Sequence, residues 1–487
     1  MFEECIFSYY IGKKEASYKE LPKRYDFDGL IVNADRRTPY DSALKDGREC
    51  AVFGYAVNVI DGNKEALPEK MLERAADIDG IIEYEKNLGG KYLILYSDKT
   101  GVYALGDATT SIPVYYCKGE LSSNPEYFCK EFGLVLDEKL QKIRESGNIS
   151  QAMPFDVTPY KEIKQLIPNH YYCFDENKSV RFVNSESKQK RISVAEATEI
   201  AKPMISHITD MYASVFDLYC PITSGRDSRV VLAFLLDSTK DKLKAYTIKH
   251  NNHIGKEQDL TVPFELAKVC PMDYQQIVDA DVSQELKNDA DVLFGQGKYS
   301  ARTLEIAYTV KSYCKDSAII NGDIIGQVGK CSLHRDIPSC FATPRYFRCK
   351  LHNYSNEAKK LLALWLKEIK NSGERVNAFD LFSVESRMGR WAGKENLIYN
   401  SLGQIYLNIF NSRSIIYTWS AVARGERKNS ALHVDLINKK YPKLLTVPFS
   451  KSSSRVARIS KSNGLFYYIS SFAKYYIEKK KFRSGVN

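Results

Sequence analysis

A short polar loop between an apolar run and a helical pattern is the most constraining feature of this sequence. The apolar run covers residues 218–222, and the loop at 224–228 reads Ser-Gly-Arg-Asp-Ser. Apolar side chains then recur at helical spacing over residues 230–236. A strand that turns directly into a helix presents unpaired backbone N–H groups, which bind anions. The segment therefore predicts a strand–loop–helix unit with an anion site.

The residue types of this loop favour a triphosphate with a metal ion. Gly225 allows a close approach of the backbone, and serine hydroxyls on either side are short donors. Asp227 would repel phosphate unless a cation such as Mg²⁺ lay between them. We therefore expect contacts to ATP from Ser224, Gly225, Arg226, Asp227, Ser228 and Arg229, with Asp227 also binding the metal. The alternative is an ordinary helix start with a Ser or Asp cap.

Ser-Gly-x-Asp-Ser after a strand resembles the pyrophosphatase loop (PP-loop) of ligases that convert ATP to AMP and pyrophosphate. Within that group the chain resembles the asparagine synthetase family. The family also includes β-lactam synthetases, lasso-peptide cyclases and amide-forming enzymes of surface-polysaccharide clusters. The resemblance implies a parallel-sheet ATP pyrophosphatase domain with a helical C-terminal part over residues 191–487. Arg226 departs from the family, which usually has glycine there.

Residues 1–190 have the pattern of a mostly stranded domain, with hairpins expected at 92–105 and 171–183. Gly89-Gly90-Lys91-Tyr92, Asp107 and Pro113-Val114-Tyr115-Tyr116 resemble pieces of a class II glutamine amidotransferase-like domain, which implies an Ntn-type αββα sandwich. Such glutaminases use an amino-terminal cysteine, whereas residue 2 here is Phe and the first cysteine is Cys5. Unless residues 1–4 are removed, we expect no glutaminase activity.

Strand and helix patterns alternate between residues 217 and 321, which predicts a parallel sheet with ligands at the carboxyl ends of its strands. Ile248 ends one of these strands and is expected to contact the nucleotide. Asn321-Gly322-Asp323 resembles the second loop of the family, so Gly322 is expected beside the nucleotide and Asp323 in metal binding and catalysis. Gly326 occupies the place of a further metal-binding Asp in that loop.

Two cationic side chains complete the expected site. Arg387 and Arg390 lie at i, i+3 in a helical pattern, and Arg387 is expected to hold pyrophosphate or an acidic substrate; a structural contact with Trp391 is the alternative. Lys451, after a Leu- and Pro-rich stretch, resembles the family's catalytic lysine, with Lys428 as second choice.

Charge is concentrated at one end of the sequence. Residues 451–487 hold nine basic and one acidic side chain, a net charge of +8 out of the chain's +10. The nearly neutral remainder argues against a nucleic-acid partner. The aromatic and basic tail at 452–487 favours a packed terminal helix with a solvated basic end over peripheral contact with an anionic membrane. No apolar run long enough to span a membrane and no secretory signal are evident, so we expect a cytoplasmic protein.

These features together predict an ATP- and Mg²⁺-dependent amide ligase, which adenylates a small or carrier-linked carboxylate and transfers it to an amine. The amine source stays open between free ammonia, a separate glutaminase and an amine-bearing substrate. The alternatives are a β-lactam synthetase or lasso-type cyclase, another PP-loop chemistry such as tRNA thiolation, and a degenerate homologue that acts as a nucleotide-binding or scaffold module.

Overall fold

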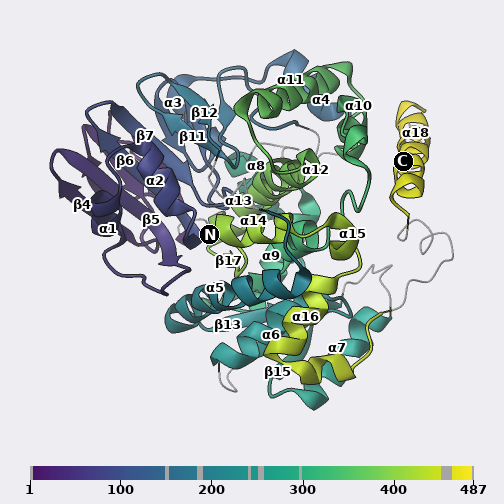
Figure 1. The fold of residues 1–487 in the computed structure, drawn as a ribbon. Helices are drawn as coiled ribbons and strands as arrows, with labels where there is room; N and C mark the ends of the chain where they lie inside the picture. Colours follow the sequence, from purple (N-terminus) through teal and green to yellow (C-terminus); the bar gives the residue numbers. More distant parts are fainter. Residues whose placement is uncertain are drawn as a thin grey trace.

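The computed structural model describes residues 4–147, 153–183, 190–239, 243–249, 257–294, 299–450 and 463–484. Within these residues the chain forms two antiparallel sheets and one parallel sheet, with helices around them (Figure 1). The mixed α/β character expected from the sequence is confirmed. The antiparallel sheets lie within residues 9–181 and the parallel sheet within residues 218–408.

Both antiparallel sheets have six strands. The first has the order β10-β8-β9-β1-β3-β2 and the second β12-β11-β7-β6-β5-β4. The strands of the first sheet are β1 (Tyr9–Gly12), β2 (Lys23–Phe27), β3 (Leu30–Ala34), β8 (Tyr115–Cys117), β9 (Glu120–Ser122) and β10 (Lys164–Gln165). Those of the second are β4 (Tyr40–Lys45), β5 (Arg48–Asn58), β6 (Leu88–Asp98), β7 (Gly101–Gly106), β11 (His170–Cys173) and β12 (Lys178–Arg181).

Alternating apolar side chains make the two sheets pack face to face. Tyr9 and Ile11 of β1 share one core with Phe53 of β5 and Leu93 of β6. On the outer face of the second sheet, α1 (Leu67–Arg74) and α2 (Ile78–Glu85) form a separate core with Val52 and Ile94. On the outer face of the first sheet, α3 (Pro125–Phe132) packs against Tyr10 and Tyr115. The layers are therefore helix, sheet, sheet, helix.

The parallel sheet has the order β15-β14-β13-β16-β17. Its strands are β13 (Leu218–Pro221), β14 (Lys244–Lys249), β15 (Asp273–Val278), β16 (Ala318–Asn321) and β17 (Ile405–Asn408). The chain runs outward from β13 to β15, returns to β16 beside β13, and continues to β17. The direction of the crossovers therefore reverses between β13 and β16, and in such sheets ligands bind at that point.

Helices cover both faces of the parallel sheet, as its apolar strands require. α6 (Asp227–Thr239) shares a core with Leu218 and Cys220, and α9 (Ala301–Tyr313) packs against Tyr219 on the other face. The other helices are α4 (Glu138–Glu145), α5 (Val194–Val215), α7 (Gln258–Val269), α8 (Gln284–Phe294), α10 (Pro344–Lys350), α11 (Asn356–Ser372), α12 (Ala378–Phe382), α13 (Gly393–Ser401), α14 (Arg413–Ala421), α15 (Arg424–Arg427), α16 (Ala431–Lys440) and α18 (Gly464–Arg483). No helix in the described part of the chain combines the length and the apolar character that crossing a bilayer requires.

The local predictions from sequence are largely confirmed. The hairpins β6–β7 and β11–β12 pair antiparallel, and the expected alternation of strands and helices between residues 217 and 321 is present. Residues 69–78 have a helical composition, but they are divided between α1 and α2 because Ala75 is extended. The predicted division into units at residue 190 stays a prediction, since residues 184–189 lie outside the described residues.

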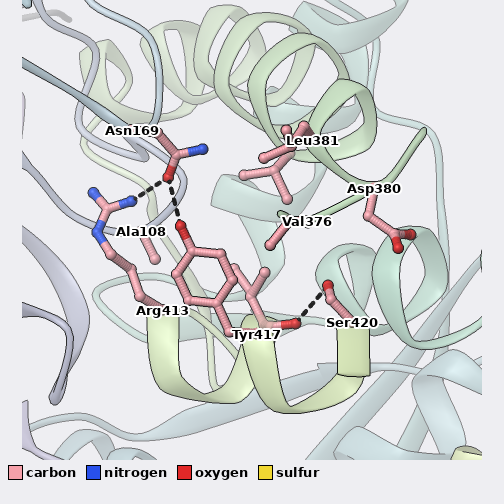
Figure 2. Close-up of a pocket in the computed structure, with 10 residues that line it drawn as sticks. Ala108, Asn169, Val376, Asp380, Leu381, Arg413, Tyr417 and Ser420 are labelled. Atoms are coloured by element: carbon pink, nitrogen blue, oxygen red, sulfur yellow. Dashed lines mark hydrogen bonds between the residues drawn. The ribbon is translucent and has the colours of Figure 1, made fainter. Parts of the chain in front are cut away.

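Buried charged groups join the antiparallel sheets to the later helices. In α14, Arg413 donates to Glu85 over 2.6 Å and to Asn169 over 2.8 Å. Figure 2 shows Arg413 and Tyr417 converging on the side-chain oxygen of Asn169, while Asp380 lies on the far side of the same small cavity. Since a buried charge without a partner is costly, these contacts fix how the two parts of the chain meet.

Lys91 of β6 crosses the same interface. Its Nζ donates to Oδ1 of Asn400 over 2.9 Å and to the carbonyl of Tyr406 over 3.2 Å, above the ring of Phe7. Only 1% of Lys91 is exposed, and burial lowers the pKa of its amine to about 7, against the opposing effect of Asp107. The buried amine is therefore neutral above about pH 7 and takes up a proton as the pH falls through that value.

We expect Arg413→Met to lower the free energy of unfolding by about 3–5 kcal/mol, because it leaves the Glu85 carboxylate buried without its cation. Urea titration of the full chain measures this loss, and a double change with Glu85→Gln should restore part of it. Arg24→Met is the matched control, since Arg24 forms an exposed ion pair with Glu15. Equal losses of unfolding free energy for Arg413→Met and Arg24→Met would contradict a stabilising role of the buried pair between Arg413 and Glu85.

Lys91 gives the stability a predictable pH dependence. Because its pKa in the folded chain is lowered to about 7 from 10.5, the unfolded chain binds more protons between these values. The free energy of unfolding of the wild type, relative to that of Lys91→Met, should therefore rise from pH 7 to pH 9 by about 1.4 kcal/mol per pH unit. Urea titrations at both pH values test this, with Lys99→Met, at an exposed lysine, as control for the lost charge. A difference that does not change with pH would be inconsistent with a neutral Lys91.

Candidate functional site

The reversal point between β13 and β16 brings both predicted loops together. The loop after β13 leads into α6 at Asp227, and Gly322-Asp323 follows β16. A β-carbon placed on Gly322 would lie 3.0 Å from the carbonyl oxygen of Asp227, so the loops are in direct contact. The sequence therefore correctly placed two polar loops at one edge of one sheet.

Within the first loop, the side chains bind one another and the start of α7. The backbone N–H and the hydroxyl of Ser224 both donate to Oδ1 of Asp259, with a distance of 3.2 Å for the N–H. The hydroxyl of Ser228 accepts from the backbone of Thr223, and Gly225 donates to the Thr223 hydroxyl. Asp259, at the start of α7, therefore fixes the shape of the loop.

Asp227 is held by two basic side chains. Its Oδ1 accepts from Nε2 of His433 over 2.9 Å and lies 3.6 Å from Nζ of Lys330. Burial alone would raise the pKa of Asp227, but the contacts to His433 and Lys330 outweigh it and lower the pKa. Burial lowers the pKa of His433 as well, so a neutral imidazole donates to a carboxylate. The sequence gave no sign of His433, which lies in α16.

Asp323 is the second carboxylate of the crevice. Burial and the neighbouring Asp227 raise the pKa of Asp323 to about 6, while Arg387 opposes the shift. Its backbone N–H donates to Oδ1 of Asn321, which also binds Asn408 of β17. Two carboxylates that repel each other at the carboxyl ends of neighbouring strands create a negative potential, which a divalent cation would neutralise.

Gly326 explains why the second loop has one acidic residue fewer than the resemblance implied. A β-carbon at Gly326 would lie 2.8 Å from Oδ2 of Asp227, so a side chain there would collide with that carboxylate. Gly326 belongs to the π-helix η3 (Ile325–Gly329), which follows Asp323 directly. Such helices are rare and often occur at functional sites.

The predicted role of Arg229 requires correction. Arg229 is fully buried, and its guanidinium donates to the carbonyls of Leu444 over 3.0 Å, Val447 and Pro448. It also stacks on Phe449, at 4.1 Å from the ring centre. These contacts hold the segment around η6 (Pro442–Thr446) against α6 and leave the guanidinium committed to carbonyls. Arg229 therefore has a structural role, and the predicted contact to phosphate is not supported.

Arg226 lies on the same aromatic ring. Its guanidinium carbon is 4.5 Å from the centre of Phe449, and the backbone N–H of Ser450 donates to the carbonyl of Ser224 over 3.4 Å. The cation that departs from the family pattern is therefore stacked beside the loop. A cation stacked on an aromatic face keeps its charge, so Arg226 remains a candidate phosphate contact.

Arg387 and Arg390 contact different parts of the molecule, whereas i, i+3 spacing in an α-helix would put both side chains on one face. They lie in the π-helix η5 (Ser383–Ala392), where the α-helical i, i+3 relation does not hold. Arg390 donates to Gln165 and to the carbonyl of Val157, at the antiparallel sheets. Arg387 acts electrostatically on Asp323 and Glu395, so it stays a candidate for the site.

Beside the loops, a cavity of about 250 Å³ opens over the ends of β13 and β14. Ile248, Thr223 and Asp259 line it, with Tyr399 and Tyr406 stacked 4.5 Å apart. A mostly apolar, aromatic cavity with a few polar groups suits a planar heterocycle such as a nucleotide base. The predicted residue Ile248 therefore lies where a base next to the loop would sit.

A second, smaller cavity extends from Asp323 to the antiparallel sheets. It has a volume of about 30 Å³ and is lined by Lys91, Thr109, Asn396 and Asn411 among others. Lys91 and Asp323 thus both line this small cavity. The sequence showed Lys91 only as part of a glycine-rich strand and gave no hint of this position.

Of the two lysine candidates, only Lys428 lies within the described residues. Lys451 lies outside the described residues, so its catalytic role stays a prediction. The second choice, Lys428, forms an ion pair with Asp336 and donates to it from the end of α15. That pairing gives Lys428 a structural partner.

The acidic groups fit Mg²⁺ only together with a phosphate ligand. Among the described residues, no group of three or more His, Cys, Asp or Glu side chains is arranged to hold a metal. Mg²⁺ commonly binds one or two carboxylates plus substrate phosphates. Asp227 and Asp323 match that smaller requirement, so they are the residues that would hold the ion.

Comparisons with known proteins give weak structural similarity and no sequence match. No family model matches the chain, and no curated protein sequence matches it. A glutamine phosphoribosylpyrophosphate amidotransferase from B. subtilis, solved with ADP and GMP, is similar with 12% identity and a TM-score of 0.21. The match covers 60% of this chain and 60% of that chain. At that TM-score, neither the fold nor the function of this chain is inferred from the similarity.

Proposed function

We propose that this protein is an ATP-dependent ligase that adenylates a carboxylate, releases pyrophosphate and transfers the acyl group to an amine. In this proposal the parallel sheet is a PP-loop domain and the antiparallel sheets are a degenerate amidotransferase-like domain. The observation that carries it is the pair Asp227 and Asp323 at the reversal point of the sheet, where burial and the charge of Asp227 together raise the pKa of Asp323 to about 6. Such a pair calls for a divalent cation and a polyanionic ligand.

The surroundings of the pair support the same ligand. The cavity lined by Ile248 and the two stacked tyrosines would take the base, and the loop at 224–228 would lie along the phosphates. When bound, Mg²⁺ would offset the negative charge of the triphosphate and of the leaving pyrophosphate. Lys330, which lies 3.6 Å from Asp227, and the neighbouring Arg226 and Arg387 are candidates to add positive charge.

The chemistry has two balanced steps. A carboxylate oxygen of the substrate bonds to the α-phosphorus of ATP, and the bond from that phosphorus to the bridging oxygen breaks, which releases pyrophosphate. The amine nitrogen then bonds to the acyl carbon, AMP departs with the oxygen, and the amine loses a proton. The chain contributes by positioning these groups and by neutralising charge.

The amidotransferase-like part supplies no activated thiol in this proposal. Cys5 is buried, and burial together with Asp35 raises the pKa of its thiol to about 12. Its sulfur donates to the carbonyl of Glu20. A protonated, enclosed thiol is a poor nucleophile, which favours ammonia from elsewhere or an amine-bearing substrate.

A second candidate is a nucleotide-binding module without turnover. The contacts of Asp227 to His433 and Lys330 favour it, because resident basic groups compete with a metal ion for Oδ1. The two candidates differ in one measurable respect, since both bind ATP with Mg²⁺ but only the ligase releases pyrophosphate when a carboxylate is added.

We expect carboxylate-dependent pyrophosphate release from the wild type with a panel of acids, and a loss of at least about a hundredfold in Asp227→Asn. Asp273→Asn is the matched control, because Asp273 is exposed at the opposite end of β15. ATP binding by calorimetry without pyrophosphate release would favour the binding module. Failure to bind ATP with Mg²⁺ would contradict both candidates.

The raised pKa of Asp323 predicts a pH dependence of nucleotide binding. The carboxylate takes up a proton as the pH falls through about 6, and a protonated carboxyl does not bind Mg²⁺. The affinity for ATP with Mg²⁺ should therefore drop by up to about tenfold per pH unit below pH 6. Calorimetry between pH 5 and pH 8 tests this, and Asp323→Asn should bind weakly with a flatter profile. An unchanged profile in Asp323→Asn would remove this carboxylate from the site.

A further inference from the structure

The carboxyl-terminal helix α18 has apolar side chains on two opposite faces. One face packs on the chain: Tyr475 donates to the carbonyl of Asn353 over 3.0 Å, and Ser471 accepts from Lys350 over 2.7 Å. Glu478 extends the same face and binds His352 over 2.8 Å. In Figure 1, α18 lies in yellow at the edge of the molecule, near α10.

The opposite face is exposed and apolar over most of its length. Leu465, Ile469, Ala473 and Tyr476 follow one another at steps of three or four residues. The first three form an exposed stripe, whereas the hydroxyl of Tyr476 accepts a hydrogen bond from Arg345 of α10. Ile469 is 57% exposed, and Ile477 beside the stripe is 59% exposed. Six of the seventeen exposed large hydrophobic side chains among the described residues lie on this one helix. Such a concentration marks an interaction surface.

The stripe continues into positive charge. The next positions at the same spacing are Lys480 and Arg483, both exposed, and Lys479 and Lys481 adjoin them. The one acidic side chain of the helix, Glu478, already contacts His352. A partner for this face must therefore accept apolar side chains at one end and be anionic at the other.

We propose that the outer face of α18 binds an anionic lipid surface, with Leu465, Ile469 and Ile477 entering the headgroup–acyl boundary and Lys480 and Arg483 meeting the lipid phosphates. A helix face with an apolar stripe and neighbouring bases is suited to lie in that interface. A second copy fits less well, because facing helices would each bring the same bases. A stable protein interface also needs about 20–30 residues a side, far more than this stripe offers.

This proposal does not depend on the ligase function. It describes contact with one face of a membrane, with the helix lying on it, and α18 stays packed through Tyr475 on its other side. Electrostatic attraction would bring the chain to the surface, and burial of the isoleucines would hold it there.

The test is flotation of the full chain with phosphatidylcholine vesicles that contain or lack phosphatidylglycerol. We expect binding to the anionic vesicles that weakens at high salt, and little binding to the neutral ones. The double change Ile469→Asp with Ile477→Asp should lower binding by at least about tenfold. Lys480→Gln and Arg483→Gln should each lower it by about fivefold.

Leu364→Asp on α11 is the matched control, since Leu364 is 63% exposed on another helix and should float as the wild type does. Circular dichroism confirms that each variant folds. Equal binding by the Ile469→Asp/Ile477→Asp protein, no binding by the wild type, or equal binding to neutral vesicles would overturn the proposal. So would a vesicle-free dimer, detected by light scattering, that this double change dissociates, because the face would then belong to a second copy.

Discussion

The repulsion between Asp227 and Asp323 is the interaction on which the interpretation of this structure depends. Two carboxylates rarely share a crevice unless something positive offsets their charge, and here burial and the charge of Asp227 together raise the pKa of Asp323. Their proximity follows from topology, since the strand order puts the ends of β13 and β16 side by side. Gly322 and Gly326 allow the close approach, because a β-carbon at either position would press on Asp227. Charge, topology and glycine placement thus agree on one location.

The sequence could predict the parts of this site that depend on local patterns. Strand and helix signals over residues 217–321 are local, so they identified β13, β14 and β16 and placed Asp227 and Asp323 at strand ends. β17 was missed because Ile405–Asn408 is a short strand within a helical region, and only pairing with β16 stabilises it. The π-helix η5 was also missed, because the spacing of apolar residues does not distinguish a π-helix from an α-helix over so short a segment.

Long-range contacts account for the remaining errors. Arg229 looked like a phosphate ligand because its neighbours in sequence form the loop, yet its partners are the carbonyls of Leu444 and Val447, far along the chain. Burial among these groups lowers its pKa to about 10. Lys91 shows the reverse error, since an unremarkable strand lysine becomes a buried amine only when Asn400 and Tyr406 close over it. Burial of a polar side chain is a tertiary property that a sequence pattern does not carry.

The basic neighbours of Asp227 decide whether the crevice can accept a metal ion. His433 is buried and its pKa is lowered, so it donates a hydrogen bond to Asp227 without adding a positive charge. Lys330 does carry charge, but it lies 3.6 Å from Oδ1 and is partly exposed, so its flexible stem can move the ammonium towards solvent or phosphate. The second oxygen, Oδ2, lies beside Gly326, where a β-carbon would be only 2.8 Å from it. A cation at this crevice would therefore compete with a single mobile charge, which is compatible with a nucleotide that brings its own Mg²⁺.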